Sequence, residues 1–207
     1  MRVNKRHGVT LIAIALIVVM LKLSGFFDSA ADSEKCIALV GANDIKAAVQ
    51  PCTTSAEQGI SSSQYVLGVM YDKGEGVTQD HKEAVRWYRK AADQGFIAAQ
   101  YNLGYSYDTG NGVVADYGEA YKWYRMAAEQ GYASAQYNLG RMYLDGRGVL
   151  KDILEAYAWF DVATTQGHQL AEKIRDFLAK NMTEVQLIEA GKLSLEYREK
   201  LVPSNGG

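Results

Sequence analysis

The sequence predicts an all-α protein: an α-α solenoid of 36-residue helix-turn-helix repeats, closed by atypical capping helices. Two observations carry this prediction. The stretch Ala-Gln-Tyr-Asn-Leu-Gly occurs at both 99–104 and 135–140, with a variant, Ser-Gln-Tyr-Val-Leu-Gly, at 63–68. One glycine also recurs every 36 residues, at Gly59, Gly95, Gly131 and Gly167. A repeat of this length is typical of units that cannot bury an apolar face alone and therefore stack on their neighbours.

The first helix of a unit is predicted over residues 61–73 in the first full repeat. Gln64, Leu67, Gly68 and Tyr71 are spaced i, i+3, i+4, i+7, so they share one side of a helix. A glycine at position 68 lets another helix approach closely, which offsets the roughly 1 kcal/mol that glycine costs inside a helix.

The second helix follows a Gly-x-Gly-Val turn, whose glycines can take positive φ. Asp80 precedes Glu83 by three residues, and the same pair recurs in the next two repeats, which predicts a capping box at the start of this helix. We expect the helix to end at Gly95. Its expected buried stripe consists of Ala84, Trp87 or Tyr88, and Ala91.

Partial units flank the three full repeats. Residues 44–59 match the second half of a repeat, with Pro51 in the place of Trp87 and expected to kink or split that helix. Residues 170–180 resemble a first helix without its consensus, and a Thr183–Gln186 capping box opens a last helix over 184–201. The expected divisions are a degenerate N-terminal repeat (32–59), three repeats (60–167), C-terminal capping helices (168–203) and a disordered tail (204–207).

The N-terminal residues differ from the rest of the chain. Three basic residues among the first six precede an apolar run over 9–21. As a helix this run would span about 20 Å, less than a hydrocarbon core of ~30 Å. The pattern predicts a signal peptide, residues 1–31, cut before Asp32. The alternative is an anchor in the inner membrane formed by residues 9–27. Both predict an exported protein, periplasmic or secreted.

Cys36 and Cys52 are the only cysteines of the chain. An oxidising compartment favours a disulfide between them. Neither a C-x-x-C spacing nor a neighbouring histidine supports the alternative, a reactive or metal-binding thiol pair. In the chain-entropy model the closed loop would contribute about 3 kcal/mol to stability.

The chain resembles the Sel1-like repeat family, a branch of the tetratricopeptide superfamily, in its unit A-x-Q-Y-x-L-G-x-x-Y-x-x-G-x-G-V-x-x-D-x-x-E-A-x-x-W-Y-x-x-A-A-x-Q-G. The resemblance extends over about residues 33–180. Membership would imply a right-handed α-α solenoid that serves as an adaptor for protein–protein contacts, in bacteria often in envelope assembly, signalling or host interaction. It implies no particular partner.

The sequence contains none of the common catalytic patterns S-x-x-K, G-x-S-x-G, H-E-x-x-H or Walker A, so we expect neither enzymatic activity nor a cofactor. His81, expected on the surface, and His168 have no ligand partner at metal-binding spacing. The segment 108–112 lacks the oxygen ligands of a calcium loop and is predicted to be a turn. No metal site is therefore expected, and a formal net charge of −2 gives no reason to expect nucleic acid.

The expected binding site is one side of the first helices, where the superfamily resemblance places a concave groove. Each repeat contributes a set of three candidate residues. The first residue of each set is a tyrosine that recurs in every repeat, which favours a packing role. The second residue of each set differs between repeats, as a specific site requires, and Tyr and Arg are enriched at binding hot spots. The sets, each spaced i, i+4, i+7, are Tyr65, Val69 and Asp72; Tyr101, Tyr105 and Asp108; and Tyr137, Arg141 and Leu144.

We therefore expect a monomeric, non-enzymatic interaction scaffold of the bacterial cell envelope that binds a peptide or partner protein in a preorganised groove. It would touch a membrane only through an uncleaved N-terminal segment. One alternative is cell-wall or β-lactam binding or hydrolysis, as in cysteine-rich relatives with a cysteine pair in each repeat. The other is a secreted factor that acts on a host.

Overall fold

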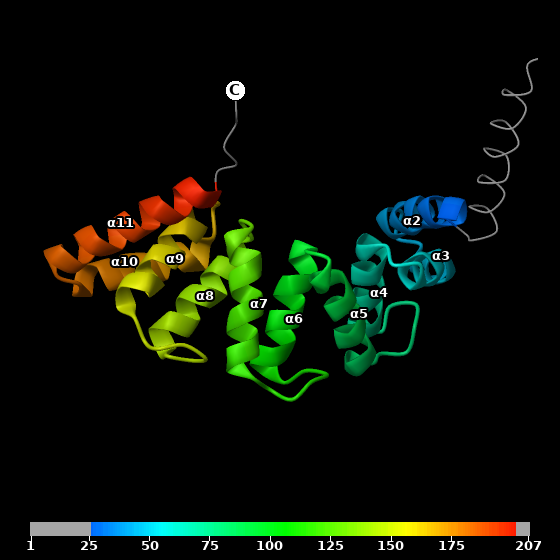
Figure 1. The fold of residues 1–207 in the computed structure, drawn as a ribbon, viewed down its shortest axis with the longest axis horizontal. Helices are drawn as coiled ribbons and strands as arrows, with labels where there is room; N and C mark the ends of the chain where they lie inside the picture. Colours follow the sequence, from blue (N-terminus) through cyan, green and yellow to red (C-terminus); the bar gives the residue numbers. More distant parts are fainter. Residues whose placement is uncertain (1–25, 202–207) are drawn as a thin grey trace, which may run out of the picture.

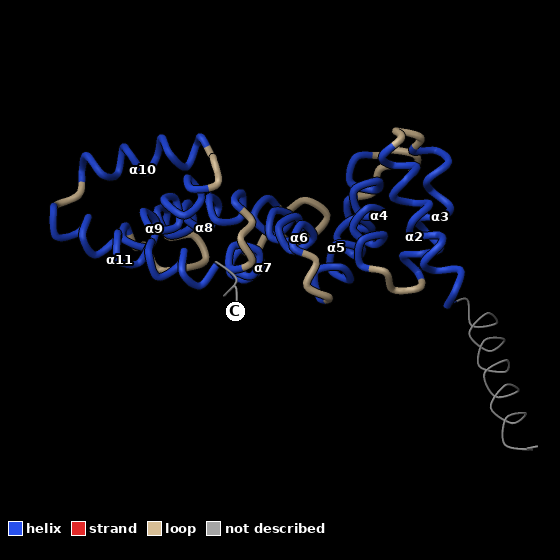
Figure 2. Tube along the Cα trace, turned by 90° about the horizontal axis from the view of Figure 1, so that it is seen from above, coloured by secondary structure: helices blue, strands red, loops and turns tan. Residues whose placement is uncertain are grey.

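The computed structural model describes residues 26–201, and within them it contains ten α-helices and no strand. From α2 to α10, helices that follow one another in the chain pack side by side, and together they form a curved array (Figures 1 and 2). The helices are α2 (Phe26–Gly41), α3 (Ile45–Glu57), α4 (Ser61–Lys73), α5 (His81–Asp93), α6 (Ile97–Thr109), α7 (Tyr117–Glu129), α8 (Ala133–Asp145), α9 (Ile153–Thr165), α10 (Gln169–Asn181) and α11 (Glu184–Leu201).

Each full repeat is a helical hairpin. The first helices are α4, α6 and α8, and the second helices are α5, α7 and α9. The predicted helices over 61–73 and 184–201 have the bounds of α4 and α11, and the helix predicted over 170–180 is one residue longer at each end, as α10. Of the segment 108–112, the first two residues end α6 and residues 110–112 form the predicted turn, with Gly110 in the left-handed conformation.

A buried glutamine ties each first helix to both neighbouring second helices. The Gln136 amide of α8 donates to the carbonyl of Ala128 on α7 at 3.1 Å, and its oxygen accepts from Gln166, just after α9, at 2.7 Å. Gln64 and Gln100 make the equivalent bonds. Since a buried amide without partners is costly, these bonds hold the register of the stack.

The second helices start with only half of the predicted capping box. The Asp80 carboxylate accepts from the backbone N–H groups of Lys82 and Glu83, at 2.9 and 3.1 Å. Glu83 does not reach back to the Asp80 N–H, because that group donates to the carbonyl of Tyr71 at 2.9 Å. The prediction is thus wrong in its second half. At the start of α11, Thr183 and Gln186 form the complete box.

The buried stripe of α5 contains Ala84, Tyr88 and Ala91, as predicted, but Trp87 lies only half-buried. The Lys90 ammonium lies 3.8 Å from the centre of the Trp87 ring, a cation–π contact at the surface. The equivalent tryptophans of α7 and α9 are buried. Trp123 packs in the core cluster of α5 and α6, and Trp159 packs in the cluster of α7 and α8 and against the Tyr197 ring.

The N-terminal hairpin of α2 and α3 is crosslinked by a disulfide between Cys36 and Cys52, both fully buried. The expected splitting of the helix at Pro51 is wrong, since α3 continues through it. Pro51 is buried and lies next to the disulfide, so packing and the crosslink offset the backbone bond that proline cannot make.

Of the predicted signal peptide, residues 26–31 belong to α2 and the remainder lies outside the described residues, as does the predicted tail over 204–207. Within residues 26–201, no helix combines the length and the apolar character that crossing a membrane requires.

The last helix leaves the repeat pattern. α11 does not pair with α10 but returns along α9 as far as α7 (Figures 1 and 2). The Tyr197 ring stacks on Trp159 with centroids 4.5 Å apart. Arg198 donates to Asp161 of α9 at 3.0 Å, and the same carboxylate accepts from Arg175 of α10 at 3.3 Å. These contacts dock α11 on the last repeat and so end the array.

Candidate functional site

An open groove lies between the first helices α4 and α6. Its volume is about 300 Å³, and we call it the tyrosine groove. It is lined by Tyr65, Val69, Asp72, Lys73, Tyr88, Tyr101, Asn102 and Tyr105. Tyr65, Val69 and Asp72 follow one side of α4, and Tyr101 and Tyr105 follow the matching side of α6, since α6 repeats α4 after 36 residues.

Of the nine candidate residues of the sequence analysis, five line this groove: Tyr65, Val69, Asp72, Tyr101 and Tyr105. The other four are not among its lining residues and lie on α6 and α8: Asp108, Tyr137, Arg141 and Leu144. The predicted residues thus do not form a single site.

The recurring tyrosines are packed and yet reach the groove. The Tyr65 ring lies 5.0 Å from Phe96 and 6.1 Å from Tyr88, between centroids, and Tyr101 lies in the same way against Tyr132 and Tyr124. Burial raises the pKa of Tyr65 and of Tyr101 above the usual tyrosine range. Both rings are therefore neutral, fixed walls of the groove at physiological pH.

The residues that vary between repeats are more accessible. Tyr105 is 49% exposed, the largest exposure of any tyrosine among residues 26–201. Val69 and Arg141 are half-buried. The Arg141 guanidinium lies 6.0 Å from the centre of the Tyr137 ring, at the outer limit of a cation–π contact. Aromatic, aliphatic and basic groups thus follow one another along the first helices.

The two candidate aspartates are held by side chains that the sequence analysis did not connect to them. Asp72 Oδ1 lies 2.9 Å from Nδ1 of His81, and the same nitrogen lies 3.2 Å from the Asn111 amide nitrogen of the next repeat. Asp108 accepts from Arg147 at 3.1 Å. His81 is thus partly exposed, as expected of a surface residue, but it is also bonded at a repeat junction, which the sequence analysis did not predict.

Three lining residues were not predicted. Asn102 is the variable neighbour of Tyr101, where the other repeats have Val66 and Asn138, so comparing the repeats could have found it. Tyr88 was assigned to the core, and its edge forms the floor of the groove. The third, Lys73, stands at the end of α4 beside Asp72.

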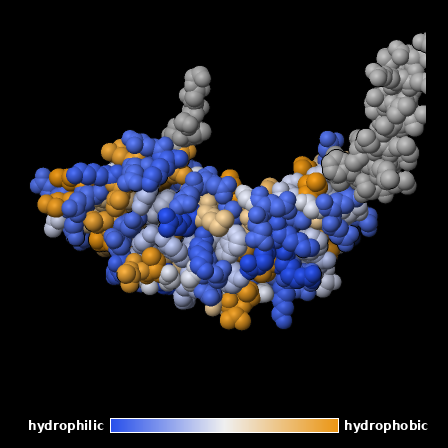
Figure 3. Space-filling model, in the orientation of Figure 1, coloured by the Kyte–Doolittle hydropathy of each residue, from blue (hydrophilic) through white to orange (hydrophobic). Residues whose placement is uncertain are grey.

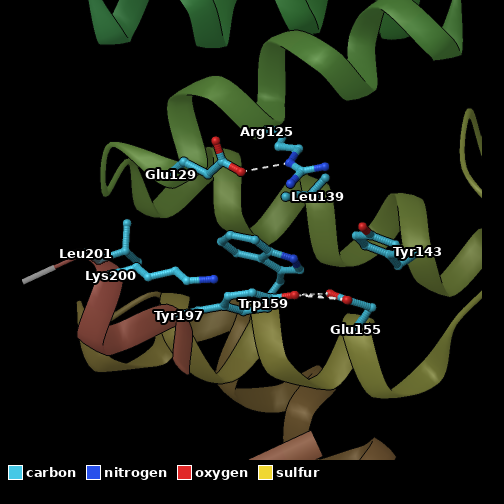
Figure 4. Close-up of a pocket in the computed structure, with 9 residues that line it drawn as sticks. All are labelled: Arg125, Glu129, Leu139, Tyr143, Glu155, Trp159, Tyr197, Lys200 and Leu201. Carbon is cyan, nitrogen blue, oxygen red and sulfur yellow. Dashed lines mark hydrogen bonds and ion pairs between the residues drawn. The ribbon is translucent and has the colours of Figure 1, made fainter. Parts of the chain in front are cut away.

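A second pocket, of about 390 Å³, lies between α11 and the helices α7, α8 and α9 (Figure 4). Trp159 and Tyr197 form one wall, and their polar neighbours bond to one another across the pocket. The Tyr197 hydroxyl lies 2.9 and 2.8 Å from the two carboxylate oxygens of Glu155, and Arg125 donates to Glu129 at 2.7 Å. Sequence reasoning missed this pocket, because it exists only where α11 folds back.

Internal pairing satisfies most of the polar groups of this second pocket. Burial, followed by the bond to Glu155, raises the pKa of Tyr197 well above the usual range, so its hydroxyl stays protonated and donates to the carboxylate. A ligand would have to replace these bonds. The arrangement is that of a helix-docking contact, whereas the tyrosine groove exposes the side chain of Tyr105.

The family model described as Sel1 repeat matches residues 61–96, 97–132 and 133–168. Each match begins with the first residue of a first helix, at Ser61, Ile97 and Ala133.

Two solved structures are similar to the chain. The Sel1 repeat protein from Oxalobacter formigenes shares 38% identity at a TM-score of 0.66, over 69% of this chain and 59% of its own. The protein c5321, a protective antigen present in uropathogenic Escherichia coli strains and displaying an SLR fold, shares 37% identity at a TM-score of 0.59, over 76% of this chain and 42% of its own. The chain thus spans less than two thirds of either neighbour. No curated protein is found to match it.

Proposed function

The chain belongs to the Sel1 repeat family, and from that premise we propose that it is a non-enzymatic scaffold of the bacterial envelope that binds a peptide or partner protein in the tyrosine groove. Proteins of this family are generally non-catalytic scaffolds for protein–protein contacts. Family membership therefore supports the class of function, and the tyrosine groove is the proposed binding site.

One observation carries the proposal: five residues selected from the sequence by their spacing line a single groove. Tyrosines are enriched at binding hot spots, because they bury a large area and keep a polar group. The rings of Tyr65 and Tyr101 are already fixed by their neighbours, so binding costs the scaffold little ordering.

Export is the second part of the proposal. The disulfide between Cys36 and Cys52 supports it, because such bonds persist mainly in oxidising compartments. The basic and apolar start of the sequence supports it as well. Cell fractionation and N-terminal sequencing of the isolated protein test this part: a cytoplasmic protein with reduced cysteines would contradict it, and an N-terminus at Asp32 would favour the cleaved form over the anchored one.

The groove is tested by site-specific crosslinking in cells. A photoreactive amino acid at Tyr105 should crosslink to a discrete partner, whereas the same group at Met126, which is exposed on α7, should not. The Tyr105→Ala variant should capture less of that partner at an unchanged melting temperature. Equal capture by the variant would contradict the groove assignment, and turnover of β-lactams or peptidoglycan fragments would contradict the non-enzymatic role.

A further inference from the structure

The helix α10 continues the stack of first helices. At each junction, the recurring tyrosine of a first helix pairs with the ring that stands just before the next first helix. At the last junction this partner is His168, the N-cap residue of α10. The centroid distances are 5.0 Å for Tyr65–Phe96, 5.0 Å for Tyr101–Tyr132 and 4.6 Å for Tyr137–His168. α10 therefore starts in the same register as α6 and α8.

The buried side of α10 agrees with this register. Ala171 and Leu178 are buried, and they stand 36 residues after Ala135 and Met142, the buried residues of α8 that pack on the preceding second helix. The side of α10 that continues the tyrosine groove must then be the side of Lys173, Phe177 and Lys180, which stand 36 residues after Tyr137, Arg141 and Leu144.

This side of α10 is open and apolar at its centre. Phe177 is 65% exposed and Leu170, two turns earlier on the same side, is 55% exposed. Both side chains stay exposed among residues 26–201, because α11 packs mainly on α9 and meets α10 only in the buried cluster that contains Leu178 and Ala190. Orange side chains gather at the end of the molecule formed by α10 and α11 (Figure 3). Exposed aromatic and aliphatic groups with polar neighbours are typical of interaction sites.

The unpaired charged residues of this surface are basic. Lys173 and Lys180 are exposed, and within residues 26–201 neither they nor Arg141 form an ion pair. Of the acidic residues of α10, Glu172 lies about 100° from Lys173 round the helix. Asp176 lies only about 60° from Lys173, but it is paired with Arg175 at 2.6 Å, which offsets its charge. Apolar and basic groups are thus combined on one side.

We propose that this surface, the basic platform, binds a protein segment that combines bulky apolar side chains with Asp or Glu. The platform consists of Arg141, Leu170, Lys173, Phe177 and Lys180. The inference rests on the proposed function: one partner chain runs along the first helices, from the tyrosine groove onto the platform. Charge complementarity selects the acidic segment, because unpaired lysines attract carboxylates and repel basic chains, while Phe177 and Leu170 receive its apolar side chains.

A selection from a random peptide library on the immobilised protein tests the composition of the partner. The selected peptides should be enriched in Asp and Glu together with Phe, Leu, Tyr or Trp. Basic or purely polar peptides would overturn the platform. A selection that enriches no peptide at all would overturn both the platform and the tyrosine groove as peptide sites.

Variants then locate the binding of the tightest selected peptide. Lys173→Glu/Lys180→Glu should weaken binding about tenfold or more at low salt, with a smaller loss at high salt. Phe177→Ala should weaken it independently of salt. Lys35→Glu/Lys46→Glu, which reverses two exposed lysines of the N-terminal hairpin, is the matched control and should leave binding unchanged.

The same variants separate the failure of the platform from the failure of the groove. If Tyr105→Ala weakens binding while the Lys173/Lys180 and Phe177 variants do not, the platform is overturned and the groove stands. Binding to anionic phospholipid vesicles that is lost in Lys173→Glu/Lys180→Glu would instead assign the platform to a lipid surface. A concentration-dependent dimer that Phe177→Ala dissociates would assign it to a second copy of the chain.

Discussion

The Tyr124 ring of α7 lies against the α-carbon of Gly104 on α6. A β-carbon on Gly104 would stand 2.8 Å from Cδ1 and 3.0 Å from Cε1 of that ring, closer than side-chain contacts allow. Tyr124 is fully buried, so its ring cannot move aside. The glycine of the repeated Ala-Gln-Tyr-Asn-Leu-Gly stretch is therefore required by the approach of the second helix, and its helix-breaking tendency is outweighed by packing.

Gly104→Ala should destabilise the protein by about 1–2 kcal/mol, because overpacking costs about 1–3 kcal/mol and the gain in helix propensity returns up to about 1. Gly140→Ala, with its nearest ring atoms at 3.0 Å, should cost less. Gly191→Ala on α11, where the added carbon meets nothing within 4 Å, is the control and should stabilise by about 0.5–1 kcal/mol. Urea unfolding of the three variants measures the change in the free energy of unfolding at each site. Equal changes at all three sites would contradict the prediction.

The Gln136–Gln166 bond links α8 to the end of α9. Gln136→Leu keeps the size of the side chain but loses this bond and the bond to Ala128, and it should cost about 1–3 kcal/mol. Gln166→Ala should cost less, because Gln166 is exposed. In a thermodynamic cycle, the stability lost in the double variant should be about 0.5–1 kcal/mol smaller than the sum of the two single losses. Strict additivity of the two changes would show that the bond contributes nothing to stability.

Most of the fold could be predicted from the sequence because equivalent residues make the same contacts in each repeat. Gln64, Gln100 and Gln136 fill one structural position, so the sequence displays three times which residues face the neighbouring helices. The residues of the tyrosine groove could be selected because the superfamily resemblance indicated one side of the first helices, and spacing then gave the positions on that side.

The contacts that could not be predicted are those whose chemistry is not repeated. His81 meets Asn111 across 30 residues through a polar contact, whereas the equivalent residues of the next repeat, Tyr117 and Arg147, form a cation–π contact. Tyr197 meets Glu155 across 42 residues, in the part of the chain that leaves the repeat pattern. The capping boxes were half wrong because local spacing cannot show that the Asp80 N–H is already used by Tyr71. Polar contacts between residues far apart in the chain form only once the helices have stacked, so the local sequence pattern cannot predict them.

Alkaline pH should destabilise the protein through its buried tyrosines. Burial raises the pKa of Tyr88 and of Tyr124 well above the usual range. The folded state therefore keeps protons that the unfolded chain has lost, so stability is constant up to the unfolded pKa of about 10 and falls as the pH rises beyond it. The free energy of unfolding at a series of pH values measures this fall. It should be shallower in Tyr88→Phe, and stability unchanged above pH 10 would contradict the prediction.

Tyr197→Phe should loosen α11 while the array stays folded. The variant keeps the ring stacked on Trp159 but removes the hydroxyl that lies 2.9 and 2.8 Å from the Glu155 oxygens, in a contact open to solvent on one side. We therefore expect a loss of about 1 kcal/mol, visible as faster hydrogen exchange in α11 and unchanged exchange in α4. Tyr105→Phe, which changes a tyrosine of the groove, is the control and should leave α11 unchanged. Because the tyrosine groove lies between α4 and α6, Tyr197→Phe should bind a groove ligand as wild type does. Weaker binding in this variant would show that the docking of α11 is coupled to the groove, and the two sites could not then be independent.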